Sequence, residues 1–152
     1  MIRTESEYVR AKERLENDKD YLGKLREALS QANLDKEETE RAMKPALSFH
    51  EQLVEEVETY ERMRRGQFDA LNDLTGIGRW LIGLRIYRGW SQRQLADALG
   101  VSEAQVSKDE RNEYHNVSTE KAQRILSALG ANFSMQIDEL GPNGAVPVVA
   151  AS

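Results

Sequence analysis

The segment spanning residues 91–112 (SQRQLADALGVSEAQVSKDERN) constrains the fold most, because it predicts two short helices joined by a tight turn. Ser91 is suited to an N-cap position, and Gln94 follows three residues later, as in a capping box. Gly100 can adopt the left-handed backbone conformation that ends many helices, and Ser102 then offers a second N-cap. We therefore predict one helix on each side of Gly100.

This pattern resembles the helix-turn-helix of the lambda-repressor and Cro-like (Xre) regulators of bacteria and phages. The match covers about residues 77–129, since GRWLIGLRIYRGW is similar to the family's first helix and STEKAQRILSALG to the helix that closes the domain. The resemblance implies an all-α DNA-binding domain of five helices, whose second motif helix enters the major groove. Ala96 and Val106 are the positions at which the two motif helices are expected to pack together.

The resemblance also implies an ion pair inside the domain. Family members often carry an arginine on the first helix that pairs with a glutamate late in the recognition helix, and Arg85 and Glu110 occupy these places. We expect Arg85 and Glu110 to form a structural ion pair that holds the recognition helix on the domain. Asp109 departs from the family pattern, which usually has a large apolar or aromatic residue at this position.

The N-terminal half shows a different pattern, with a seam of apolar residues at alternating steps of three and four. The seam consists of Tyr8, Ala11, Leu15, Asp18, Leu22, Leu25, Leu29 and Ala32. Asn33 and Leu34 break this helix, and Asp35 begins a second helix that reaches about residue 65, with Pro45 expected to kink or restart it. An antiparallel hairpin follows, with Tyr8 opposite Tyr60 and Asp18 opposite His50. We interpret the Asp–His contact as a register-fixing pair, because no third ligand or nucleophile accompanies it.

Some apolar residues of the hairpin lie partly outside this seam, and they suggest a contact with a second copy or a partner. These residues are Val9, Tyr21, Ala28, Phe49 and Met63. In the alternative arrangement, the hairpin folds onto its own DNA-binding domain through Phe68, Leu71 and Leu74.

A short strand is the expectation after the closing helix, because Phe133, Met135 and Ile137 alternate with polar residues. Here the sequence resembles antitoxin regulators of the HipB type, in which such a strand is shared between subunits. An extension that packs on its own domain is the alternative. The remaining sequence, GPNGAVPVVAAS, predicts a flexible tail.

Charge and composition limit the function classes. The net charge is −5, but residues 1–75 contain 13 Lys and Arg against 18 Asp and Glu, whereas residues 76–152 contain eight of each. The excess acid therefore belongs to the hairpin, and nonspecific affinity for DNA should be modest. Cysteine is absent, and no apolar run approaches the roughly 18 residues of a membrane span, so we expect a cytoplasmic protein that does not bind membranes.

The resemblance assigns the residues that would contact double-stranded DNA. The expected base contacts are Ser102, Glu103, Ala104, Gln105, Ser107 and Lys108. The expected contacts to the DNA backbone are Arg88, Gln92, Arg93, Asn112, Tyr114 and Asn116. We assign no catalytic residue, metal site or cofactor, because no phosphate-binding glycine loop, triad or metal cluster is found.

Three regions follow from these patterns. Residues 1–66 form the antiparallel helical hairpin for dimerization or partner binding, residues 67–131 form the lambda-repressor-like domain, and residues 132–152 form the strand and tail. The expected function is a transcriptional repressor, not an enzyme, that binds a palindromic operator as a homodimer. An antitoxin that sequesters a toxin protein and represses its own promoter is one alternative. An adaptor that kept the fold without binding DNA is another, favoured by Glu103, Asp109 and the acidic balance.

Overall fold

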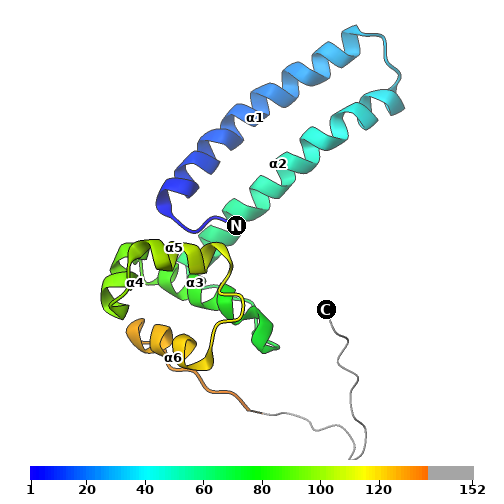
Figure 1. The fold of residues 1–152 in the computed structure, drawn as a ribbon. Helices are drawn as coiled ribbons and strands as arrows, with labels where there is room; N and C mark the ends of the chain where they lie inside the picture. The colour runs from blue at the N-terminus through cyan, green and yellow to red at the C-terminus, as the bar shows by residue number, and fades with distance from the viewer. Residues whose placement is uncertain (137–152) are drawn as a thin grey trace, which may run out of the picture.

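The protein is all-α in the part that the computed structural model describes, residues 1–136, with six α helices, one short 3-10 helix and no strand there (Figure 1). Two long helices form a hairpin, and four shorter helices form a compact domain at its base. The elements are α1 (Glu5–Gln31), α2 (Lys36–Arg64), η1 (Leu74–Gly76), α3 (Ile77–Tyr87), α4 (Gln92–Leu99), α5 (Glu103–Arg111) and α6 (Thr119–Ala128).

The predicted hairpin is confirmed, and its base is fixed by two tyrosines. The rings of Tyr8 and Tyr60 stack with their centroids 5.0 Å apart. The Tyr8 hydroxyl donates to Glu61 across the seam at 2.6 Å, and the Tyr60 hydroxyl donates to Glu5 at 3.2 Å. These reciprocal hydrogen bonds set the register of α1 against α2. Burial beside Glu5 raises the pKa of Tyr60 to about 12, so its hydroxyl stays a donor at neutral pH.

Asp18 and His50 face one another in the middle of the hairpin, as the pairing predicted. His50 Nδ1 lies 3.9 Å from Asp18 Oδ2, which is too long for a hydrogen bond, and this nitrogen is buried without a partner. The approach of Asp18 and His50 therefore supports the predicted register, although it is not a hydrogen bond.

The helix α2 continues through Pro45 instead of restarting there.

The helix-turn-helix region forms as the sequence predicts. Ser91 caps α4 in a capping box with Gln94, and Gly100 ends it with φ of 68°. The Ser102 hydroxyl accepts a hydrogen bond from the backbone N–H of Gln105 at 3.1 Å and caps α5. Ala96 and Val106 are both buried, which lets the two helices cross closely.

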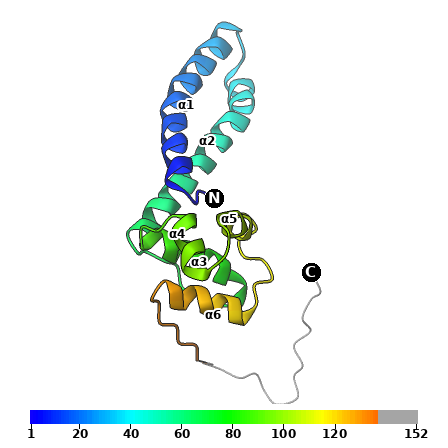
Figure 2. The same ribbon diagram turned by 60° about the vertical axis from the view of Figure 1, so that its left-hand side comes forward.

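The hairpin and the compact domain share one hydrophobic core. Ile2, just before α1, is buried in this core together with Leu81, Leu95 and Ile125 of the domain. Two views show the rest of the hairpin projecting away from α4, α5 and α6 (Figures 1 and 2). In the linker, the centroid of the Phe68 ring lies 5.1 Å from that of the Trp80 ring in α3. The predicted alternative, a contact between the hairpin and its own domain through Phe68, is therefore found at the base of the hairpin.

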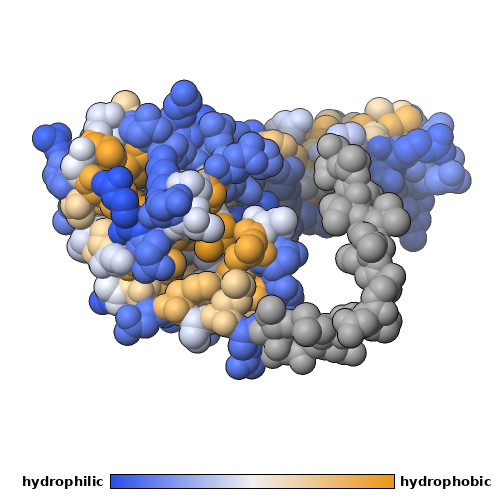
Figure 3. All heavy atoms as spheres, turned by 60° about the horizontal axis from the view of Figure 1, so that its bottom comes forward, coloured by the Kyte–Doolittle hydropathy of each residue, from blue (hydrophilic) through white to orange (hydrophobic). Residues whose placement is uncertain are grey.

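Two expectations differ from the structure. The described part contains four α helices after the hairpin, where the resemblance implied five, because only α4 and α5 lie between α3 and α6 and residues 112–118 contain turns instead of a further helix. The predicted strand is also absent from its described portion, since residues 132–136 have no regular structure and Phe133 and Met135 are exposed. Ile137 and the predicted tail lie outside the described residues. Figure 3 shows the α6 side of the molecule, where hydrophobic residues lie among hydrophilic ones.

Candidate nucleic-acid interface

The helix α5 presents one face to the core and the opposite face to solvent. Val106 and Glu110 are buried and point inward. At 100° per residue, Ala104 and Lys108 lie on the far side of the helix, and both are exposed. The side chain of Lys108 makes no hydrogen bond or ion pair with any described residue, and neither does the exposed side chain of Glu103. These side chains are therefore free for an external partner.

A buried ion pair holds this helix in place. Arg85 is 2% exposed and Glu110 is 0% exposed. The guanidinium donates to both carboxylate oxygens, from Nε at 2.5 Å and from Nη2 at 2.6 Å, in the bidentate geometry that makes such pairs strong. The remaining donors of Arg85 reach the backbone carbonyls of Trp90 at 2.6 Å and Arg3 at 2.8 Å. The structure thus contains the pair that the resemblance implied, and it also connects that pair to the N-terminal segment.

Two glutamines that were expected to contact DNA already bind carboxylates of α5. The Gln92 amide donates to Glu110 at 2.8 Å, and the Gln105 amide donates to Asp109 at 2.9 Å. The Gln92 contact places the start of α4 beside the last turn of α5. Asp109 accepts a further hydrogen bond from Lys121 on α6 at 2.6 Å. A polar network therefore occupies the position where the family usually has an apolar side chain.

The loop from Asn112 to Val117 follows α5 and is held tightly against α3. Glu113, Tyr114 and Asn116 all have positive φ, a conformation that is uncommon for residues other than glycine. Asn112 and Asn116 are exposed, as is His115, whereas Tyr114 is 4% exposed and packs in the core. Burial of its ring near Glu110 and Asp109 raises the pKa of the Tyr114 phenol. This burial is a physical argument against a contact between the Tyr114 side chain and DNA.

The positive charges of this domain fall into two groups. Most of these side chains donate hydrogen bonds to acceptors within the protein: Arg79 to Glu113, Arg85 to Glu110, Arg88 to the Gly130 carbonyl, Lys121 to Asp109 and Arg124 to the Leu99 carbonyl. Within residues 76–136, the cations without such a partner are Arg93, Lys108 and Arg111. All three lie on the two helices of the motif, α4 and α5. Arg111 is not among the contacts that the resemblance implied, although it follows Lys108 by three residues, about one helical turn.

A comparison with protein families finds a match between residues 84–134 and a helix-turn-helix family, HTH_3. Residues 84–134 are a Cro/C1-type helix-turn-helix domain. The match begins within α3 and covers α4, α5 and α6. Searches of curated proteins and of solved structures returned no match.

The family match indicates DNA binding, which agrees with the free cations on the motif helices. The family is non-catalytic. Nothing in the comparisons supports the antitoxin interpretation, and the strand that motivated it is absent from the described residues. Among residues 1–136, no helix is both long and apolar enough to cross a bilayer.

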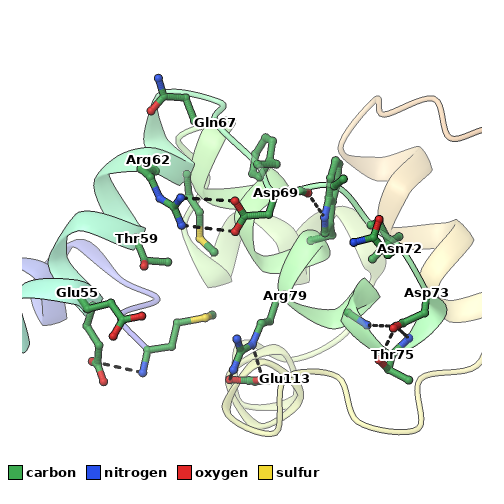
Figure 4. Close-up of a pocket in the computed structure, with 18 of the residues that line it drawn as sticks. Glu55, Thr59, Arg62, Gln67, Asp69, Asn72, Asp73, Thr75, Arg79 and Glu113 are labelled. Atoms are coloured by element: carbon green, nitrogen blue, oxygen red, sulfur yellow. Dashed lines mark hydrogen bonds and ion pairs between the residues drawn. The ribbon is translucent and has the colours of Figure 1, made fainter. Parts of the chain in front are cut away.

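The joint between the hairpin and the helix-turn-helix domain contains a pocket of about 610 Å³ (Figure 4). Ion pairs surround it: Arg62 of α2 points toward Asp69 of the linker at 3.5 Å, and Arg79 of α3 points toward Glu113 at 2.9 Å. The Trp80 indole donates to the Asp69 carbonyl at 3.1 Å. These contacts join α2 and α3 to the linker, and α3 to the loop after α5.

Proposed function

We propose that the protein is a sequence-specific transcriptional regulator, and that it represses by occupying a palindromic operator as a homodimer. The observation that carries this proposal is the placement of Arg93, Lys108 and Arg111 without protein partners on the two helices of a Cro/C1-type motif. Free guanidinium and ammonium groups can donate hydrogen bonds to phosphate oxygens and to the acceptor atoms on the edge of guanine.

The proposed contacts follow from this geometry. Lys108 and Ala104 lie on the outer face of α5 and contact base edges, where Lys108 donates to guanine acceptors and Ala104 packs on a thymine methyl. Glu103, Ser102, Ser107 and Gln105 flank them. Arg93 and Arg111 contact phosphates, with support from the exposed Arg88, Asn112 and Asn116.

Replacement of Lys108 by alanine is expected to weaken specific binding by about 5- to 150-fold without a change in melting temperature, because the exposed Lys108 side chain makes no hydrogen bond or ion pair with a described residue. The binding site is first obtained by selection from random duplex DNA, and affinity is then measured by fluorescence anisotropy at several salt concentrations. Lys24→Ala is the matched control, since this lysine is exposed on the hairpin.

The salt dependence distinguishes the proposed roles. Arg93→Ala should lower the slope of log K against log salt by about 1, which is the signature of one lost phosphate contact. A wild-type protein that enriches no sequence from the random pool contradicts the proposed function. Unchanged affinity of the Lys108 variant would leave DNA binding possible but would rule out this recognition face.

The homodimer is proposed to form through one face of the hairpin. Arg14 lies over the Phe49 ring at 4.4 Å, so α1 and α2 present these residues on the same side. Tyr21 and Ala28 follow Arg14 at intervals of seven residues, which keeps them on that side of α1. Tyr21 is 56% exposed and Phe49 46% exposed, whereas the opposite side of α1 carries Lys12, Lys19 and Arg26. We name the side with Tyr21, Ala28 and Phe49 the aromatic face.

The outer half of the hairpin has apolar side chains that a second subunit could bury. The shared core reaches up the hairpin only to Leu15 and Leu53. Beyond it, Met43 is buried at 3% exposed, but Leu22, Leu25 and Leu29 remain partly exposed, because two helices bury only the centre of the seam between them. A second hairpin, packed on the aromatic face about a two-fold axis, would complete a four-helix arrangement.

Substitution of both Tyr21 and Phe49 by serine is expected to raise the dimer dissociation constant by about 30-fold or more, because aromatic residues dominate interface energies. Sedimentation equilibrium over a range of protein concentrations measures the constant. Val9→Ser is the control, since Val9 is 46% exposed but lies on the back of α1. A monomeric wild-type protein at micromolar concentration would refute the homodimer, and an unaffected double variant would refute this face.

A further inference from the structure

Asp109 lies on the side of α5 that faces α6, and it binds two side chains at once. Its Oδ1 accepts from Gln105 Nε2 at 2.9 Å, and its Oδ2 accepts from Lys121 Nζ at 2.6 Å. The carboxylate is mostly buried, with its side chain 19% exposed. Because Lys121 belongs to α6, the position of Asp109 is fixed by the body of the domain and not by α5 alone.

This contact fixes the orientation of the Gln105 amide. An ionised carboxylate only accepts hydrogen bonds, so it binds the NH2 end of the amide and repels the carbonyl end. One of the two N–H groups of Gln105 is therefore used by Asp109. The other N–H and the carbonyl oxygen remain, and they present one donor and one acceptor to an external partner.

The bases differ in their response to such a donor–acceptor pair. Adenine offers the N7 acceptor and the N6 amino donor in the major groove, which is the complement of the remaining amide groups. Guanine offers two acceptors, N7 and O6, so the Gln105 carbonyl oxygen would meet the guanine O6. An amide without Asp109 could turn its NH2 group toward guanine and avoid this repulsion.

We infer that Asp109, anchored by Lys121, is a positioning residue that makes Gln105 select adenine over guanine. This inference rests on the proposed function, because it assigns a base preference to the recognition helix. Asp109 does not touch DNA itself, and its effect on sequence choice passes through the Gln105 amide. The departure from the apolar residue usual in the family thus becomes a determinant of sequence preference.

The test compares sequences enriched from one pool of random duplex DNA by the wild-type protein, Gln105→Ala and Asp109→Leu. The Gln105 variant identifies the base pair that Gln105 contacts, because the preference at that position alone is lost. We expect the wild type to favour adenine over guanine there by about 5- to 150-fold. The Asp109→Leu protein should reduce this ratio to less than about 3-fold and leave the other positions unchanged.

Two further proteins keep the test decisive. Asp109→Ala removes the acceptor without adding bulk, and it replaces Asp109→Leu if thermal melting shows that the leucine variant is unfolded. Glu120→Ala is the matched control, because this exposed carboxylate precedes Lys121 and makes no hydrogen bond with the Gln105 side chain. A full adenine preference in folded Asp109 variants overturns the inference, as does a Gln105→Ala protein with unaltered preferences. In both cases the wild type still selects a sequence, whereas failure of the proposed function would leave no sequence to compare.

Discussion

Replacement of Glu110 by alanine is expected to lower the free energy of unfolding by about 3–5 kcal/mol, which is a large part of the stability of a small protein. Glu110 is 0% exposed and neutralises Arg85 through two short hydrogen bonds. Without it, the guanidinium remains buried with a full charge and only backbone carbonyls beside it. The Gln92 amide also loses its acceptor. Urea denaturation, followed by the helical circular dichroism signal, measures the change.

An exposed ion pair of the same domain provides the comparison for this measurement. Arg79 and Glu113 lie 2.9 Å apart, but their side chains are 66% and 40% exposed. Arg79→Ala should therefore change the free energy of unfolding by no more than about 1 kcal/mol. If Glu110→Ala and Arg79→Ala destabilise the protein equally, the Arg85–Glu110 pair is not buried in solution.

Substitution of Gly78 by alanine is expected to destabilise the protein by about 1–3 kcal/mol or more, because α3 and the loop after α5 are in close contact at this point. A Cβ atom on Gly78 would lie 1.8 Å from the Glu113 carbonyl oxygen, which belongs to the backbone and cannot rotate away. The loop would have to move, although Glu113, Tyr114 and Asn116 hold it in left-handed conformations. Displacement of the loop should also weaken DNA binding.

Gly23 offers the same substitution with the opposite expected sign. It lies inside α1, and a Cβ atom there would meet nothing within 4 Å. Gly23→Ala should raise the free energy of unfolding by about 0.5–1 kcal/mol through helix propensity alone. Thermal and urea denaturation of both variants decide the matter: equal melting temperatures for Gly78→Ala and the wild type would show that the close approach is not maintained.

Local signals in the sequence predicted most of the helical organisation. Ser91, Gly100, Ser102 and Asp35 act within one or two turns of the chain, so their caps could be assigned from spacing alone. The pairing of Tyr8 with Tyr60 also followed, because an antiparallel hairpin with a short turn leaves one register.

Contacts between distant residues could not be predicted in this way. The Ser102 cap forms as predicted, but the contact of the Gln105 side chain with Asp109 depends on Lys121, which lies on another helix and binds the same carboxylate. The predicted strand required a neighbouring strand, which alternation alone does not supply, and residues 132–136 have no regular structure. The resemblance implied that Tyr114 contacts the DNA backbone, whereas the left-handed turn around it directs its ring into the core.

The insertion of the N-terminal segment has a consequence for recombination between proteins. Ile2 fills part of the core of the DNA-binding region, and the Arg3 carbonyl accepts a hydrogen bond from Arg85 at 2.8 Å. A chimera joined in the linker near residue 66 would therefore separate the N-terminal segment from the DNA-binding region that it packs against. Chimeras with other regulators should retain residues 1–3 together with the motif helices α4 and α5. Without Ile2 the core would contain a cavity, and without the Arg3 carbonyl Arg85 would lose a hydrogen-bond acceptor.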